Sequence, residues 1–233
     1  MNEFQLSKRL EKVASFVATD SRVADIGSDH AYLIVSLMTQ GKIEYGVAGE
    51  VVKGPFQSAV EQIKKSGYFG KIHARLASGL DAIHSEDGID TVVIAGMGGV
   101  LIRDILSDGF QKGKLEGVKT LILQPNVGEM QVREWLIDHG FQVEEEAILI
   151  ENDKIYEIIK AVTSPSPVQA NSRQLRFGFH LLEEKNEVFV EKWKRELETA
   201  EFVSRKLKEA KTPNPEKELE IASTISEIKE VLS

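Results

Sequence analysis

The fold of this chain is decided by the stretch Val23-Ala24-Asp25-Ile26-Gly27-Ser28-Asp29-His30-Ala31-Tyr32-Leu33. An apolar, strand-like run ends at Asp25, a glycine turn follows at Gly27, and a helical pattern opens at Ala31. A strand, a tight turn and a helix N-terminus in this order form the nucleotide-binding unit of doubly wound α/β folds. The turn needs a glycine because the backbone passes close to the ligand there.

The composition of this turn also indicates which ligand it binds. A dinucleotide site would carry the pattern G-x-G-x-x-G, so that a pyrophosphate can lie on the helix N-terminus. Asp29 occupies the second glycine position instead, and its carboxylate would repel a diphosphate. S-adenosylmethionine fits better, because it carries a sulfonium and an amino group beside its carboxylate. The turn therefore favours methyl transfer and disfavours a nicotinamide-dependent Rossmann enzyme.

The alternation of strand and helix continues along the chain. We predict strands at 43–48, 72–77, 91–94 and 120–123, with helices at 31–40, 53–66, 99–108 and 127–139. This order predicts an α/β fold with a parallel, doubly wound sheet and right-handed crossovers. Ligands of such sheets bind at the carboxyl ends of the strands, so the ends of the first four strands should meet in one crevice.

Segments on both sides of this region have patterns of their own. Residues 3–18 place apolar side chains on one helical face, which predicts a covering helix, while 141–151 and 155–162 alternate as a β-hairpin does. The proline-rich stretch 163–167 marks a boundary, because each proline disfavours helix at the residue before it. We therefore divide the chain into a cofactor-binding domain, 1–165, and a helical segment, 166–233.

The helical segment contains two amphipathic stretches, 171–210 and 216–232, separated by Thr212-Pro213-Asn214-Pro215. Their spacing predicts two helices in an antiparallel, coiled-coil-like hairpin. Such a hairpin is either a packing or dimerisation element or an arm that grips RNA, and the sequence pattern does not separate the two.

Composition excludes several classes of protein. No apolar run approaches the roughly 20 residues that a membrane span needs, and we expect no leader segment. The lack of cysteine excludes disulfides, and with no histidine cluster at ligand spacing we expect no metal. A formal charge of −8 argues against a uniformly basic nucleic-acid surface, but local patches such as Lys8, Arg9, Lys12 and Arg22 suit either solvent or RNA. We expect a cytoplasmic enzyme.

Specific motifs then resemble one family, the bacterial tRNA (adenine-N1)-methyltransferases that modify adenine 22. The resemblance is carried by 24–33, Ala48-Gly49-Glu50, Ala77-Ser78-Gly79-Leu80, Ile94-Ala95-Gly96-Met97-Gly98-Gly99, Leu6-Ser7-Lys8-Arg9-Leu10 and Leu123-Gln124-Pro125-Asn126. With the helical carboxyl-terminal part, it covers essentially the whole chain. One departure is Ile34, which stands where the family has a proline.

The resemblance implies a class I, Rossmann-like methyltransferase that transfers the methyl group of S-adenosylmethionine to N1 of adenine 22 in the D-loop region of tRNA. It also implies that the hairpin of 166–233 is the tRNA-binding arm. We expect tRNA as the partner, no membrane, and a monomer or weak dimer. The alternatives are a S-adenosylmethionine-dependent methyltransferase of another RNA, of a small molecule or of a protein, and a non-enzymatic RNA-binding protein.

Eleven residues at the strand ends are candidates for cofactor binding. Asp25 should orient the amino group, and Glu50 lies about 20 residues past the turn, where nucleotide folds place the acid that binds the ribose. Leu80 should form an apolar shelf for the adenine ring. The full set is Asp25, Gly27, Ser28, His30, Ala31, Glu50, Ser78, Gly79, Leu80, Ala95 and Gly96.

The loop Ala95-Gly96-Met97-Gly98-Gly99 replaces the Asn/Asp-Pro-Pro-Tyr/Phe motif of many amino-methyltransferases. Adenine N1 bears a lone pair and no proton, so it attacks the sulfonium directly, and a carboxylate near the cationic product would stabilise it. Asp29 is the catalytic candidate, with a helix N-cap as the alternative role. The candidates for substrate binding are Lys8, Arg9, Tyr32, Met97, Gln124 and Asn126.

Overall fold

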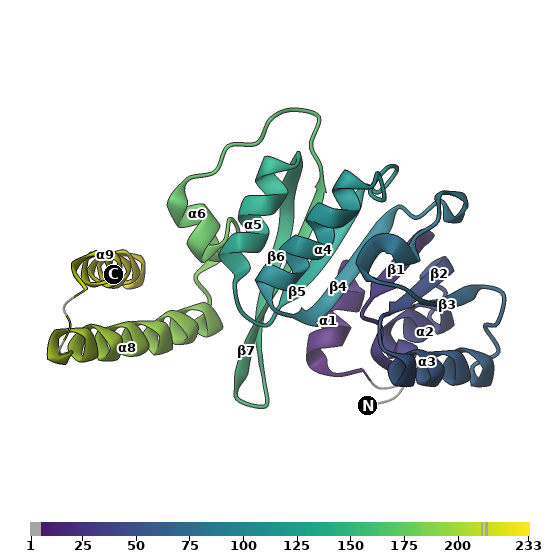
Figure 1. The fold of residues 1–233 in the computed structure, drawn as a ribbon, viewed down its shortest axis with the longest axis horizontal. Coiled ribbons are helices and arrows are strands. Elements are labelled where there is room, and N and C mark those ends of the chain that lie inside the picture. Colours follow the sequence, from purple (N-terminus) through teal and green to yellow (C-terminus); the bar gives the residue numbers. More distant parts are fainter. Residues whose placement is uncertain (1–5, 211, 213) are drawn as a thin grey trace.

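The computed structural model describes residues 6–210, 212 and 214–233 and is built around one seven-stranded sheet in the order β3-β2-β1-β4-β5-β7-β6 (Figure 1). The first five strands are parallel, and β7 pairs antiparallel with both β5 and β6. Both features confirm the expected doubly wound sheet that ends in a hairpin. The strands are β1 Ser21–Ile26, β2 Ile43–Glu50, β3 Ile72–Leu76, β4 Thr91–Met97, β5 Thr120–Pro125, β6 Phe141–Glu151 and β7 Lys154–Thr163.

Helices cover both faces of the sheet, because the strands are apolar on both sides. In β4, Val92 and Ile94 belong to one core cluster and Val93 to the other. The first cluster packs under α4 and α5, and the second under α1, α2 and α3. Near-continuous apolar strands of this kind are typical of parallel sheets buried on both faces. The helices are α1 Lys8–Phe16, α2 Tyr32–Thr39, α3 Lys53–Lys65, α4 Gly99–Gln111 and α5 Glu129–Asp138.

The order of the strands places the crevice. β1 lies between β2 and β4, so the chain winds outward in opposite directions from β1. Three short 3-10 helices follow β1 and β3, namely η1 Asp29–Ala31, η2 Gly79–Ala82 and η3 Ser85–Asp87. Ligands of open α/β sheets bind at such a switch point, outside the carboxyl ends of the strands.

The amino-terminal helix is shorter than expected. The side chain of Ser7 accepts a hydrogen bond from the amide of Leu10 and so caps α1, which begins at Lys8. Residues 3–5 of the expected helix lie outside the described part of the chain. Val13, Ala14 and Phe16 are buried against the sheet, so α1 covers it as expected.

The expected single helix over 171–210 is wrong, because three helices occupy this stretch. They are α6 Ser172–Phe177, α7 Leu181–Glu184 and α8 Glu187–Glu209. The chain turns at Gly178, with φ of 92°, and at Lys185, with φ of 45°. The side chain of Asn186 then starts α8 by accepting a hydrogen bond from the amide of Phe189.

The final helix, α9 Pro215–Leu232, forms a helical hairpin with α8 (Figure 1). Asn214 caps α9, whereas Pro213 of the expected break lies outside the described residues. The hairpin shares a core with the sheet: Ile148 of β6 packs with Phe177, Trp193 and Ile228. In the described part of the chain, no helix is both long enough and apolar enough to span a membrane.

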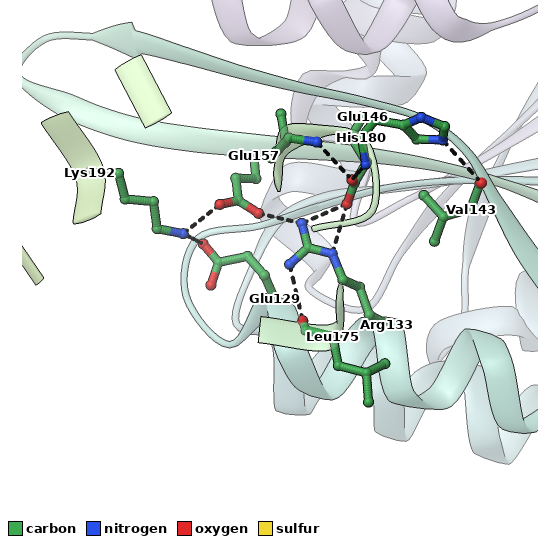
Figure 2. Close-up of polar contacts among 9 residues, drawn as sticks. Glu129, Arg133, Val143, Glu146, Glu157, Leu175, His180 and Lys192 are labelled. Atoms are coloured by element: carbon green, nitrogen blue, oxygen red, sulfur yellow. Dashed lines mark hydrogen bonds and ion pairs between the residues drawn. The ribbon is translucent and has the colours of Figure 1, made fainter. Parts of the chain in front are cut away.

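Buried charges join the helical segment to the sheet (Figure 2). Arg133 of α5 is fully buried and lies 2.6 Å from both Glu146 of β6 and Glu157 of β7. Burial alone would lower the pKa of the Arg133 guanidinium, but the two carboxylates hold it above its usual value. Glu146 also accepts a hydrogen bond of 2.8 Å from the amide of His180. The residues after the proline-rich boundary therefore complete the environment of a buried cation in α5.

Candidate active site

A cavity of about 440 Å³ opens at the carboxyl ends of β1, β2 and β4, next to the turn after β3. This crevice lies where the strand order reverses, as expected for a doubly wound sheet. It is lined by Arg9, Leu10, Asp25, Ile26, Gly27, Ser28, Asp29, Tyr32, Leu33, Gly49, Glu50, Val51, Ala77, Ser78, Gly79, Ala95, Gly96, Met97, Leu101 and Ile105.

The loop between β1 and α2 forms the floor of the crevice in an unusual backbone conformation. Gly27 has φ of 74°, and a Cβ at this position would lie 2.2 Å from Cε of Met97. His30 and Ala31 also have positive φ, at 62° and 56°. Left-handed conformations outside glycine cost roughly 1–3 kcal/mol each, and they concentrate at functional sites. The backbone of this loop is therefore held by the surrounding structure in a conformation that its residue types disfavour.

Asp25 ends β1 inside the protein. Its carboxylate is 4% exposed and accepts a hydrogen bond of 2.6 Å from the hydroxyl of Ser28. Burial raises the pKa of the Asp25 carboxyl to about 6; the bond from Ser28 opposes the rise, and the nearby charge of Glu50 adds to it. A positively charged group placed beside Asp25 would reverse this shift.

Glu50 ends the neighbouring strand β2 and lines the same crevice. Its Oε1 accepts hydrogen bonds from the amides of Val51 and Val52, at 2.8 and 3.0 Å. Within the described chain, no hydrogen bond reaches its Oε2. The backbone thus fixes the carboxylate with one oxygen left for a ligand.

Eight of the eleven expected cofactor residues border the crevice, and three do not. Leu80 is fully buried in the core, beneath Gly109, so its side chain is no shelf for the adenine ring. Ala31 is also fully buried, because the chain turns inward before α2. The ring of His30 stacks on Tyr32 at 5.4 Å and does not line the cavity.

Apolar residues of α4 take the place expected for Leu80. Leu101 and Ile105 line the crevice one helical turn apart, and Ile105 lies beside Gly79. Their spacing was indistinguishable from that of core residues such as Ile102 and Leu106. Sequence reasoning missed them for that reason, since only the packing of α4 on the sheet decides which face meets the cavity.

The expected substrate residues divide in a similar way. Arg9, Tyr32 and Met97 border the crevice. Lys8 does not, and its backbone amide donates a hydrogen bond of 2.6 Å to Glu151. Asn126 lies beside the crevice and donates from Nδ2 to the carbonyl of Gly96 at 2.8 Å.

Gln124 cannot read a base edge as expected, because it is fully buried and its amide is already engaged. Its Oε1 accepts a hydrogen bond from the guanidinium of Arg9, and its Nε2 donates to the carbonyl of Pro125 at 2.8 Å. The Arg9 guanidinium also lies 5.5 Å from the centre of the Tyr156 ring. Gln124 and Tyr156 therefore hold Arg9 at the crevice, and Tyr156 was not recognised from the sequence.

Asp29 lies at the mouth of the crevice and caps no helix. Its side chain is 73% exposed, and its Oδ1 lies 3.5 Å from Nε2 of His30. Neither η1 nor α2 has a side-chain cap. The residue before α2 is Ala31, not Asp29. The helix-cap alternative is therefore wrong, and the carboxylate is available to a ligand.

The residues present fit S-adenosylmethionine. Asp25 and Glu50 offer carboxylate oxygens for an ammonium group and for ribose hydroxyls, and Ala77 and Ile105 offer apolar walls. The turn at Gly27 has no room for a side chain, and the missing side chain lets a ligand approach the backbone closely. The fold and this crevice define a S-adenosylmethionine-dependent methyltransferase of class I, with a Rossmann-like sheet.

Comparison with known proteins gives the particular family. Residues 23–230 match the family described as tRNA (adenine(22)-N(1))-methyltransferase, and the chain belongs to it. The Bacillus subtilis tRNA (adenine(22)-N(1))-methyltransferase is 39% identical over 238 residues, which cover 100% of this chain and 99% of that protein.

Two solved structures are similar over nearly the full length. One is a Streptococcus pneumoniae putative tRNA (m1A22) methyltransferase in complex with S-adenosyl-L-methionine, with 44% identity and a TM-score of 0.89 over 98% of this chain and 100% of that one. The other is an M. capricolum protein in complex with the cofactor product S-adenosyl-homocysteine, with 27% identity and a TM-score of 0.87 over 97% of both chains.

Proposed function

We propose that the crevice binds S-adenosylmethionine and presents its methyl group to N1 of adenine 22 of tRNA. The observation that carries this proposal is the pair of carboxylates at the ends of β1 and β2, Asp25 and Glu50, which line one crevice together with the turn at Gly27. S-adenosylmethionine supplies a methyl group attached to positively charged sulfur. A nitrogen lone pair can attack the carbon of this methyl group, and the sulfur then leaves as a neutral thioether.

In this proposal the two carboxylates orient the cofactor. Asp25, once ionised, accepts hydrogen bonds from the ammonium group, and the free oxygen of Glu50 accepts from the ribose hydroxyls. Ser78 and Gly79 border the adenine ring, with Ala77 and Ile105 as apolar walls. Ala95 and Gly96 leave space on the side where the substrate base enters.

The chemical step needs no base at N1, because adenine N1 has no proton to lose. Methylation instead places a positive charge on the ring, and that charge raises the acidity of N6. We assign Asp29 the role of stabilising this charge or accepting the N6 proton, since its carboxylate is exposed at the mouth of the crevice. Tyr32 and Met97 are the apolar surfaces beside which the base would lie.

Binding of tRNA involves the rim of the crevice and the helical segment. Arg9, held by Gln124 and Tyr156, points a fixed guanidinium at the crevice and suits a phosphate of the target nucleotide. Segment 166–233 is the proposed tRNA-binding arm. The monomer or weak dimer and the cytoplasmic location stay predictions, to be tested by light scattering and cell fractionation.

Methylation of tRNA transcripts tests the proposed function directly. The protein and S-adenosylmethionine should convert adenine 22 to 1-methyladenosine in a transcript, as read by mass spectrometry of RNA fragments. A transcript with guanine at position 22 should stay unmodified. Methylation of both transcripts at the same rate would assign the activity to another position.

A further inference from the structure

A second cavity lies between the sheet domain and the helical hairpin. This groove has a volume of about 600 Å³. Its lining includes Val127, Met130, Trp193, Thr199, Thr224 and Ile228.

The loop 126–128 lines the groove and is hydrogen-bonded to the loop after β4, whose Gly96 and Met97 line the crevice. On the crevice side, Asn126 donates to the carbonyl of Gly96, and the amide of Gly99 donates to the carbonyl of Val127 at 2.7 Å. On the groove side, Lys192 holds the next residue, Glu129, at 2.6 Å (Figure 2). The loop 126–128 is thus held between residues that line the crevice and residues that line the groove.

The surface of the groove combines apolar faces with polar edges. Val127 of the loop 126–128 is 68% exposed, and apolar side chains of α5, α8 and α9, among them Met130 and Ile228, continue the lining of the groove. The hydroxyls of Thr199 and Thr224 each donate to a carbonyl of their own helix, and each oxygen can still accept a hydrogen bond from a ligand. The indole nitrogen of Trp193 is buried and has no hydrogen-bond partner among the described residues. An acceptor atom brought beside that nitrogen would gain a hydrogen bond.

The positive charges around the groove are already paired, which argues against a phosphate as the occupant. Lys192 is bound to Glu129 and Glu157, and Nε of Arg176 lies 3.0 Å from Glu227. Arg195 is paired with Glu191 at 2.8 Å. A phosphate would have to displace these carboxylates, whereas an uncharged base would not.

We propose that the groove binds the base of a nucleotide next to the target adenine, and this inference rests on the proposed function. Reaching adenine 22 requires its extrusion from the stack, which also unstacks its neighbours. Unstacked RNA bases bind against apolar and aromatic surfaces, with hydrogen bonds to their edges. The groove offers both, beside a loop that is hydrogen-bonded to the crevice residues Gly96 and Met97. It takes an uncharged nucleobase at position 21 or 23 of the tRNA.

Abasic nucleotides test which base the groove holds. We expect an abasic site at position 21 or at position 23 to raise the Kd of the wild-type protein for tRNA at least tenfold, as measured by fluorescence anisotropy. Thr199→Trp fills the groove from the exposed surface of α8 and should weaken binding of intact tRNA to a similar extent. With this variant, the abasic site at the sensitive position should cause no further loss.

Glu198→Trp is the matched control, because Glu198 is exposed on the same helix but does not line the groove. This variant should bind tRNA as the wild type does, and both variants should bind S-adenosylmethionine normally. The inference is overturned if neither abasic site weakens binding, or if Thr199→Trp and the abasic site weaken it additively. Methylation of intact tRNA by the wild type is read in parallel, so failure of the groove and failure of the proposed function are distinguishable.

Discussion

Nζ of Lys192 in α8 lies 2.6 Å from Glu129 at the start of α5 and 2.7 Å from Glu157 in β7 (Figure 2). Burial opposes ionisation of both partners, yet the pKa of Lys192 is raised and that of Glu157 is lowered, because each stabilises the charge of the other. Glu157 also binds Arg133. One set of buried charges therefore connects the helical hairpin to the sheet and to the helix that follows the loop 126–128.

Lys192→Met should destabilise the whole protein. The change leaves Glu129 and Glu157 without their shared cation, and removal of one partner of a buried pair costs about 3 kcal/mol or more. For a chain of this size, the melting temperature should fall by roughly 6–12 °C. Lys206→Met is the control, since Lys206 pairs with Glu209 on the surface, where both side chains are at least 60% exposed. Equal melting temperatures for the two variants would contradict a structural role for the buried set.

Binding of S-adenosylmethionine should depend on pH through Asp25. The ordinary pKa of this carboxyl is 3.8 and the folded value is about 6, so its protonated form is favoured in the folded protein. Only the ionised form attracts an ammonium group, so affinity should rise with pH up to about 6 and then level. Below 6 it should fall about tenfold for each pH unit. Calorimetry from pH 5 to 7.5 measures this directly.

Asp25→Asn provides the control for this dependence. The variant should bind the cofactor weakly at every pH in that range. Because the native pKa is raised, the wild type loses stability as the pH rises from 3.8 to 6, by about 3 kcal/mol in total. Asp25→Asn should lack this loss and be the more stable protein at pH 7. A wild-type affinity that is flat across the range would exclude Asp25 as the ligand of the ammonium group.

Glu50→Gln should weaken cofactor binding at least tenfold without unfolding the protein. The amide can keep one oxygen toward Val51 and Val52, but it loses the charge that strengthens the hydrogen bonds to the ribose. Glu44→Gln, at an exposed position of the same strand, is the matched control. Equal affinities of the two variants in calorimetry would remove Glu50 from the site.

Gly27→Ala and Gly41→Ala separate backbone strain from crowding. Both glycines have positive φ, 74° and 66°, so each alanine should cost about 1–2 kcal/mol of stability. A Cβ at position 41 meets nothing within 4 Å, whereas one at position 27 would push against Met97 in the crevice. Only Gly27→Ala should therefore lower the affinity for S-adenosylmethionine. Similar losses of affinity in both variants would point to a general loosening of the fold.

The sequence was sufficient to predict the sheet, because strand-like runs alternate with helical patterns along the chain and glycine turns follow several of the strands. It was not sufficient where distant residues decide the outcome. Arg133, Glu146 and Glu157 each read as surface charges on amphipathic elements, and only the fold buries them together. The same holds for His30 and Ala31, whose residue types give no sign of the left-handed backbone they adopt. Because of this left-handed backbone, α2 begins only at Tyr32, and Asp29 is too far from its first residue to cap it.

Asp29→Asn tests the proposed catalytic carboxylate. The side chain caps no helix and is 73% exposed, so Asp29→Asn and Asp29→Ala should both change the free energy of unfolding by less than about 0.5 kcal/mol. Both should bind S-adenosylmethionine and tRNA nearly as the wild type does. The single-turnover rate of methyl transfer should fall by roughly two to four orders of magnitude in each, because the charge beside the cationic product is lost.

The matched control for Asp29 is Glu86→Gln. Glu86 is 76% exposed and lies 3.6 Å from His84, in a pair that resembles the pair of Asp29 with His30, but it does not line the crevice. Its loss should leave the rate unchanged. If Asp29→Asn keeps the full rate while Asp29→Ala loses it, a polar contact and not the charge supports the reaction. If both keep the full rate, another group must stabilise the cation, and the carboxylate at the mouth of the crevice has no part in the chemistry.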